Sequence, residues 1–259
     1  MRFANRGIAE TRRLQGPTEP PLGIGPADVH VWLIDLRDAG HSVGRLSELL
    51  SGTESERAKS FANPAQRREW IAVRAALRCI LALYLNAAPQ RLEFVAAPLG
   101  KPYVHLSGQR CAIQYSVSHT VGKTLVAVSR DLAVGVDIER ISIDSDVMSI
   151  ARYLNLDMRG ANSSCQELKV FYEQWTKIEA SVKAQGVGLA YGRKAPPRKD
   201  ECGSGWTVNS LDLAAEDASQ YAAALAVEDS GKTWRQIDAS IDFENVEILP
   251  LDNGQEQIL

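Results

Sequence analysis

Gly135-Val136-Asp137-Ile138-Glu139 is the stretch of this chain that says most about its fold and chemistry. Its acidic residues alternate with apolar ones, which is the periodicity of a β-strand, so both carboxylates leave one face of that strand. We expect a strand over residues 132–138, in which Gly135 allows another backbone to approach closely.

A second segment, Trp175-Thr176-Lys177-Ile178-Glu179-Ala180-Ser181-Val182-Lys183, places Glu179 42 positions after Asp137 (179 − 137). It lies in a pattern that predicts a long helix over residues 167–185, closed by Gly186. Glu179 and Lys183 are four residues apart, so they share one face of that helix.

Three carboxylates, those of Asp137, Glu139 and Glu179, would repel one another if they converged without charged partners. A divalent cation relieves such repulsion, and an all-oxygen ligand set suits Mg²⁺. A lysine beside such a site, here Lys183, is typical of a phosphate contact. The two segments therefore predict Mg²⁺-dependent chemistry on a phosphate ester.

The rest of the chain mixes strands and helices. Pro64 opens a second long helix, to about residue 86, with apolar residues at spacings of three and four. Its arginine-bearing face, with Arg74 and Arg78, is expected to be solvated. Shorter helices are predicted at 45–50, at 51–61 with a cap at Ser51, and at 146–153. Strands are predicted at 28–36, 91–96, 111–118, 124–128, 206–213 and 221–227, and near 246–249.

This order of elements predicts an α+β protein of two similar lobes, each with a long helix packed on a small sheet. Residues 1–27 are rich in Arg, Gly and Pro and are predicted to be a disordered or loose lead-in. Residues 28–115 would form the N-terminal lobe and residues 116–228 the C-terminal lobe with the metal site. Residues 229–259 would be a C-terminal extension.

Composition argues against several classes of protein. A formal net charge of −3 disfavours broad nucleic-acid binding, which normally requires a basic domain. The four cysteines form no Cys-x-x-Cys pair or zinc pattern. The N-terminus lacks the apolar core of a signal peptide, and no stretch is long and apolar enough to span a membrane. We therefore expect a soluble cytoplasmic protein with no membrane or nucleic-acid partner.

Several spaced motifs together resemble the 4′-phosphopantetheinyl transferases, specifically the larger surfactin-synthetase-type subgroup. Each motif is common alone, but their order and spacing over roughly residues 45–227 are distinctive. They are Leu99-Gly100-Lys101-Pro102-Tyr103, Tyr115-Ser116-Val117-Ser118-His119-Thr120, the Asp-x-Glu stretch at residues 135–139, and Trp175-Thr176 with Glu179-Ala180 and Lys183, followed by Gly186 and Gly188-Leu189.

The resemblance implies transfer of the phosphopantetheine arm of coenzyme A to a serine of an apo acyl or peptidyl carrier protein, with release of 3′,5′-ADP. It also implies two lobes related by a pseudo-twofold axis, with coenzyme A in the cleft between them. A monomer is expected, because one chain already forms that cleft. Fatty-acid, polyketide and nonribosomal-peptide carriers all fit the resemblance.

The resemblance also implies roles for individual residues. Mg²⁺ would lie on Asp137, Glu139 and Glu179. Glu179 would in addition take the proton of the carrier serine, and Lys183 would stabilise charge on the transferring phosphate. The implied contacts to coenzyme A are Lys101 and His119 at the 3′-phosphate and adenosine end, Ser118 as a hydroxyl donor, and Arg57 and Arg74 on the first lobe.

Simpler structural interpretations stand beside these roles. Asp137 and Glu139 could be solvated on an edge strand, and Glu179 and Lys183 could form an ordinary helix-surface pair. His119 could be a satisfied core or turn histidine, and Lys101 could be merely exposed. Trp175 is interpreted as core packing. The basic segment 192–199 is interpreted as an exposed flexible loop, with contact to an acidic carrier as the alternative.

Two departures from the family pattern keep other functions open. Ile178 stands where the family usually has a lysine, and Lys177 cannot replace it because a one-residue shift turns a helical side chain by about 100°. Residues 151–158 also fit the usual segment poorly. The alternatives are a weakened or non-catalytic protein that binds coenzyme A or a carrier, and a metal-dependent nuclease or phosphohydrolase, because Asp-x-Glu also serves two-metal sites.

Overall fold

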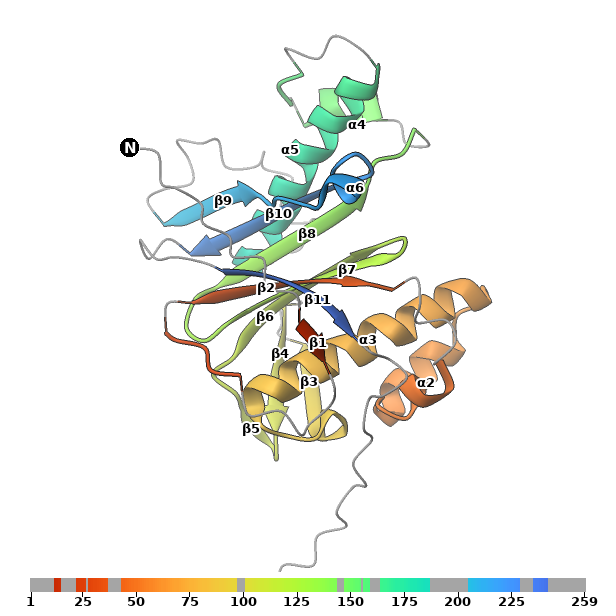
Figure 1. Cartoon of the computed structure of the whole chain (residues 1–259), viewed down its shortest axis with the longest axis vertical. Coiled ribbons are helices and arrows are strands. Elements are labelled where there is room, and N and C mark those ends of the chain that lie inside the picture. The colour runs from red at the N-terminus through yellow and green to blue at the C-terminus, as the bar shows by residue number, and fades with distance from the viewer. Residues whose placement is uncertain are drawn as a thin grey trace, which may run out of the picture.

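Two long helices cover the outer faces of two β-sheets whose inner faces pack together (Figure 1). The structure is a computed structural model that describes residues 12–14, 22–26, 28–36, 43–96, 101–143, 147–154, 156–158, 164–186, 205–228 and 235–241. Helix α3 (Pro64–Leu85) and helix α5 (Ser164–Gln185) each have 22 residues. The mixed α+β class expected from the sequence is confirmed at this level.

The larger sheet has five strands in the order β1-β11-β2-β7-β6. The pairs β1–β11 and β11–β2 are parallel, whereas β2–β7 and β7–β6 are antiparallel. Segments from both ends of the described chain thus lie side by side at one edge. The strands are β1 (Arg12–Leu14), β2 (Val29–Asp35), β6 (Gln114–Thr120), β7 (Lys123–Ser129) and β11 (Arg235–Ile241).

The smaller sheet carries the acidic stretch. It is antiparallel, in the order β8-β10-β9, and β8 is therefore an edge strand. A third antiparallel sheet, β3-β4-β5, lies beside α3. These strands are β3 (Leu92–Ala96), β4 (Pro102–Leu106), β5 (Gln109–Arg110), β8 (Val134–Arg140), β9 (Trp206–Ser210) and β10 (Tyr221–Glu228).

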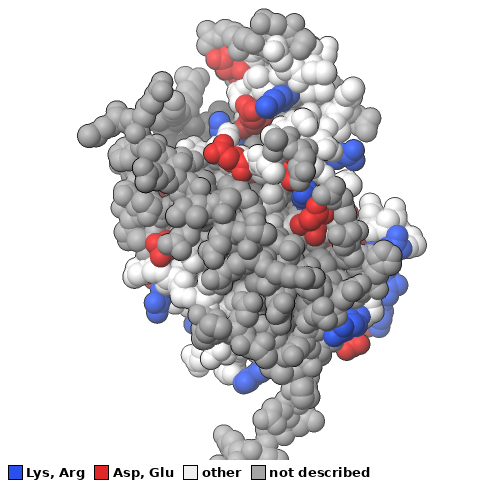
Figure 2. Space-filling model, in the orientation of Figure 1, with Lys and Arg blue, Asp and Glu red and all other residues white. Residues whose placement is uncertain are grey.

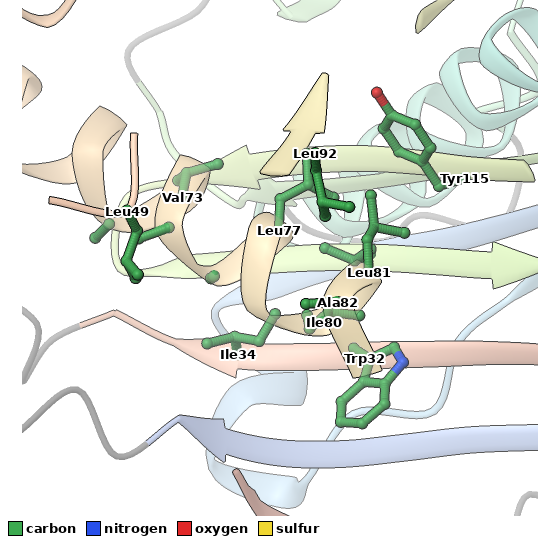
Figure 3. Close-up of a cluster of buried hydrophobic side chains, with 14 of the residues drawn as sticks. Trp32, Ile34, Leu49, Val73, Leu77, Ile80, Leu81, Ala82, Leu92 and Tyr115 are labelled. Atoms are coloured by element: carbon green, nitrogen blue, oxygen red, sulfur yellow. The ribbon is translucent and has the colours of Figure 1, made fainter. Parts of the chain in front are cut away.

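Strand β2 shows how sequence periodicity builds the layers. Trp32 and Ile34 belong to the hydrophobic cluster formed with α3, and Figure 3 shows both beside the helix. Val29 and Val31 belong to a different cluster, with Val136 of the smaller sheet. Alternate residues of one strand therefore bury opposite faces of the sheet, which places a core on each side of it.

The helix ends follow from local sequence. Ser51 caps α2 (Gly52–Lys59) in a capping box, in which its hydroxyl accepts from the Glu54 backbone N–H and the Glu54 carboxylate accepts from the Ser51 backbone N–H. Asn63 caps α3, with Pro64 in its first turn, and Asn86 ends it in the left-handed conformation. The remaining helices are α1 (Val43–Ser47), the 3₁₀ turn η2 (Pro89–Arg91), α4 (Val147–Tyr153) and α6 (Ala215–Ala218).

The expectation that Arg74 and Arg78 form a solvated helix face is wrong. Arg78 is 1 % exposed and donates to Glu54 Oε2 through Nε at 2.8 Å and to the carbonyls of Pro89 and Leu92. Arg74 Nε donates to Glu54 Oε1 at 2.8 Å. Burial raises the pKa of Glu54, but Arg74, the Ser51 N–H and Arg78 outweigh it, so the pKa is lowered overall. The interactions of Glu54 with Arg74 and Arg78 therefore hold α2 against α3.

Glu54→Gln should therefore destabilise the protein by about 3 kcal/mol, because it leaves the buried Arg78 guanidinium without a countercharge. The free energy of unfolding, measured by denaturant titration, checks this. Glu56→Gln is the matched control, since Glu56 pairs with Lys59 on the surface and such pairs contribute less than about 1 kcal/mol. Equal effects of the two substitutions would contradict the assignment.

The predicted helices at residues 51–61 and 64–86 match α2 and α3, and the helix predicted at 167–185 begins three residues earlier, at Ser164. Strands β1, β4, β5 and β11 were not predicted, and β1 lies within the predicted loose lead-in. Residues 99–100 and 188–189 of the quoted motifs, the basic segment 192–199 and the strand predicted near 246–249 lie outside the described residues. In the part of the chain that is described, no helix is both long enough and apolar enough to cross a membrane.

Candidate active site

The centre of the candidate site is a closed triangle of Asp137, Ser118 and Lys183. Asp137, on β8, is 2 % exposed. Its Oδ1 accepts from Ser118 Oγ of β6 and from Lys183 Nζ of α5, both at 2.7 Å. Lys183 Nζ also donates to Ser118 Oγ at 2.9 Å. Three elements from both sheets and the outer helix thus meet at one buried carboxylate.

Gly135 sets how closely α5 approaches β8. A Cβ atom on Gly135 would lie 2.0 Å from the Ala180 carbonyl oxygen and 2.4 Å from the Ala184 nitrogen. The expectation of a close backbone approach at this glycine is confirmed. The contact is lined by small residues, which leave no side-chain bulk between helix and sheet. They are Ala180, Ala184, Ala224 and Ala226.

Two further carboxylates lie in the electrostatic field of Asp137. Burial, Asp137 and Glu179 raise the pKa of Glu139 to about 7, against the opposing effects of Lys183 and a hydrogen bond with Trp175. Burial and Asp137 likewise raise the pKa of Glu179, again opposed by Lys183. The acids of β8 and α5 therefore lie on the same side of the molecule and repel one another.

Two oxygens of this cluster are buried and have no hydrogen-bond partner, Asp137 Oδ2 and Glu179 Oε1. Buried carboxylate oxygens without partners are costly, and a cation would satisfy them. The donors are all oxygen, which suits Mg²⁺. Within the described residues, however, no three His, Cys, Asp or Glu side chains already form a metal-binding group. The oxygen donors of the cluster therefore suit Mg²⁺, but the described side chains do not already form a complete coordination site.

The raised pKa of Glu139 predicts a pH dependence of stability in metal-free protein. The folded state holds this proton up to about pH 7, whereas the ordinary pKa of such a carboxyl is 4.5, so the folded state binds more protons between these values. Stability should therefore fall as pH rises from 4.5 through 7. Glu139→Gln should remove this part of the slope. Urea titrations in EDTA across that range would check it, and an unchanged slope in the variant would contradict it.

His119 lies at the end of β6, next to Ser118, and its side chain is exposed. The pKa of His119 is lowered overall, because the effects of the surrounding protein and of Lys183 outweigh that of Glu69 on α3, which raises it. Glu69 Oε1 also accepts from the Gly122 N–H, in the turn between β6 and β7. His119 is thus an exposed neighbour of Ser118 that feels the charges of both Lys183 and Glu69.

Three other predicted contacts to coenzyme A have different surroundings. Lys101 Nζ donates to the carbonyl oxygens of Val134 and Ala184. Arg74 is engaged by Glu54, and its guanidinium lies over the Phe94 ring at 4.3 Å. Arg57 is exposed, 5.3 Å from the Phe61 ring centroid. The contacts of the two arginines thus lie on or next to α2 and on β3, away from the triangle.

Two contributors to the site were not predicted. Trp175, interpreted as core packing, stacks on Phe171 and also donates to Glu139. Its position four residues before Glu179 places both on one helix face, and that spacing could have indicated the role. Glu69, beside His119, carried no such signal, because its partner is in a turn 53 residues away.

The described residues on the face shown in Figure 2 do not present a field of one sign. On the face shown in Figure 2, acidic and basic side chains are interspersed, with basic ones gathered toward α2 and α3. The exposed basic residues on these helices are Arg57, Lys59, Arg67 and Arg68.

The layered α+β fold and the buried carboxylate–lysine cluster define an enzyme-like site for a charged substrate. No family model matches the chain. It is 29 % identical over 221 residues to the 4′-phosphopantetheinyl transferase HetI of Nostoc sp., a match that covers 81 % of this chain and 92 % of that protein. It is also 27 % identical to a phosphopantetheinyl transferase of Thraustochytrium sp., over 64 % of each chain. With the 4′-phosphopantetheinyl transferase gsp of Aneurinibacillus migulanus it shares 30 % identity, over 44 % of this chain and 46 % of that one.

The chain is thus similar over most of its length to 4′-phosphopantetheinyl transferases, which are enzymes, and this confirms the resemblance that its motifs indicated. A match that covers 81 % of the chain includes both long helices and strands β6, β7 and β8, and therefore the three segments that meet at Asp137.

Proposed function

We propose that this protein transfers the 4′-phosphopantetheine arm of coenzyme A to a serine of an apo acyl or peptidyl carrier protein in an Mg²⁺-dependent reaction. The observation that carries the proposal is the buried triangle of Asp137, Ser118 and Lys183, bordered by Glu139 and Glu179. It unites three segments that resemble separate family motifs. The similarity to HetI over most of both chains supports the same reaction class.

In this proposal, Asp137, Glu139 and Glu179 hold the metal, and the unpartnered oxygens of Asp137 and Glu179 provide open positions for it. When bound, Mg²⁺ would neutralise charge on the pyrophosphate and on the leaving group. Ser118 fixes the Asp137 carboxylate by donating to Oδ1, which leaves Oδ2 free for another partner.

Residues of the chain would accept the proton of the carrier serine and stabilise the charge on the transferring phosphate. The carrier serine oxygen forms a bond to phosphorus as the phosphorus–oxygen bond to 3′,5′-ADP breaks. Glu179 takes the serine proton, a role favoured by its raised pKa. Lys183, already hydrogen-bonded to Ser118 and Asp137, stabilises the charge on the transferring phosphate.

For coenzyme A itself, His119 is the candidate contact that the surroundings favour most, since it is exposed next to the triangle. Arg57 is exposed, but it lies on α2, away from the triangle, and is a weaker candidate. Arg74 is engaged by Glu54 and is a weaker candidate. Charge-assisted hydrogen bonds of this kind suit the 3′-phosphate and the pyrophosphate.

We infer a pseudo-twofold pair of lobes, residues 28–115 and 116–228, from the two helix-covered sheets. Strand β7 of the second lobe pairs with β2 of the first, and β6, which spans the boundary between them, pairs with β7, so the lobes would share a sheet. Coenzyme A would lie between them, in a monomer acting in the cytoplasm. An acidic carrier would meet the mixed, locally basic surface near α2 and α3.

A second candidate is a binding protein that retains the fold without transfer. Ile178, where the family usually has lysine, is the observation that favours it. The nuclease or phosphohydrolase alternative gains nothing from the relatives, which are named as transferases.

Incubation of the protein with apo carrier, coenzyme A and Mg²⁺ tests the proposal. The carrier should gain the mass of one phosphopantetheine group, and it should not do so in EDTA or when its acceptor serine is replaced by alanine. No gain across fatty-acid, polyketide and nonribosomal-peptide carriers, with coenzyme A binding retained in calorimetry, would replace the proposal with the binding-protein alternative.

A further inference from the structure

Lys101 has contacts that differ from those of a ligand-binding lysine. Its ammonium group donates to the Ala184 carbonyl oxygen at 3.0 Å and to the Val134 carbonyl oxygen at 3.1 Å. Its aliphatic stem lies against Gly186, because a Cβ on that glycine would be 3.3 Å from Lys101 Cβ and 3.4 Å from Cδ. Two of the three N–H donors of its ammonium group are thus used by backbone carbonyls of α5 and β8.

These two carbonyls come from the point where the helix and the strand approach most closely. Ala184 lies in the last turn of α5, and Val134 is the first residue of β8. Gly135, next to Val134, faces the backbone of Ala184. Lys101 therefore bridges helix and strand where they cross. Its partner Ala184 is one residue from Lys183, and its partner Val134 is three residues from Asp137.

The last carbonyls of a helix have no partner within the helix, and a cation there also offsets the helix dipole. At the end of α5, Gly186 has a φ of +70° and its N–H donates to the Lys183 carbonyl at 3.2 Å. The Ala184 carbonyl is satisfied by Lys101 instead. Burial lowers the pKa of Lys101 to about 8, against the opposing charge of Glu228. The side chain is half-buried.

We propose that Lys101 is a positioning residue, which locks the last turn of α5 onto β8 and thereby fixes Glu179 and Lys183 relative to Asp137. It acts through the helix, and its ammonium is not the main contact to the 3′-phosphate of coenzyme A. The kinetic part of this inference rests on the proposed transferase function, whereas the structural part does not.

Hydrogen exchange tests the structural part without any need for activity. In Lys101→Met, amides in the last turn of α5 and at the start of β8 should exchange faster than in the wild type. Lys169→Met is the matched control, because Lys169 is exposed on the same helix. Lys101→Gln keeps an N–H donor without the charge and should lie between Lys101→Met and the wild type. Unchanged exchange in Lys101→Met and Lys101→Gln would overturn the inference.

Kinetics with coenzyme A and with its analogue lacking the 3′-phosphate separates positioning from phosphate binding. A misplaced catalytic pair should lower kcat by about 10- to 100-fold in Lys101→Met and leave KM for coenzyme A nearly unchanged. The preference for coenzyme A over the analogue should persist. Lys101→Arg, which can donate to both carbonyls, should recover most of kcat. A raised KM together with loss of that preference would overturn the inference.

The two failures are distinguishable. A wild-type protein that transfers nothing to any carrier would remove the proposed function, and the exchange experiment would still decide the role of Lys101. An active wild type with normal kcat in Lys101→Met would remove the positioning role alone.

Discussion

Asp137→Ala should lower phosphopantetheine transfer by at least about 10³-fold while the protein stays folded, which is the scale of losing a preorganised charge at a reacting phosphate. The carboxylate accepts from Ser118 and Lys183 and carries one of the two unpartnered oxygens of the cluster. Its removal takes away both the proposed metal ligand and the group that orients Lys183.

Folding should survive this change because Lys183 is not fully enclosed. Its side chain is 31 % exposed, so the ammonium can turn toward water once Asp137 is gone. Intact-mass assays of the carrier measure the activity, and circular dichroism with a thermal melt checks the fold. Asp131→Ala is the matched control, since Asp131 is exposed six residues earlier.

Asp137→Asn makes the test sharper. The amide can still accept a hydrogen bond, but it has no charge for Mg²⁺ or for Lys183. It should therefore be nearly as inactive as Asp137→Ala. Full Mg²⁺-dependent activity in either variant would show that the metal is held elsewhere.

The elements that could be predicted from the sequence are those with strong local periodicity. Helix α3 has apolar residues at helical spacing and a capped start at Asn63 and Pro64. Strand β2 alternates between two cores. The close packing around Asp137 could also be predicted from the sequence, because Gly135 in an acidic strand and the small residues of α5 both indicate it.

The parts that could not be predicted depend on partners far away in the chain. Strand β11 reads RQIDASI, which lacks clear alternation, and it forms by parallel pairing with β2, more than 200 residues earlier. Arg78 looked solvated because periodicity describes a helix alone, whereas Glu54 of α2 supplies its buried countercharge. The motif around Lys101 predicts a phosphate contact, but it does not reveal that two backbone carbonyls accept hydrogen bonds from its ammonium group.

The second large effect is expected at Gly135. Gly135→Val should destabilise the fold by more than about 4 kcal/mol, because its Cβ would need the space of the Ala180 carbonyl oxygen, 2.0 Å away, and of the Ala184 nitrogen, 2.4 Å away. Both obstacles are backbone atoms of α5, so a change of rotamer cannot relieve the clash. The helix would have to move off β8, which also separates Glu179 and Lys183 from Asp137.

Gly52→Ala is the matched control for this prediction. Gly52 is the first residue of α2, and nothing lies within 4 Å of a Cβ placed there, so this substitution should be neutral or slightly stabilising. Denaturant titration gives the free energy of unfolding of both variants, and transfer assays show whether Gly135→Ala, the smallest added side chain, already loses activity. A Gly135→Ala protein with wild-type stability and activity would mean that α5 does not lie against β8 at this point, and the geometry of the whole site would have to be abandoned with it.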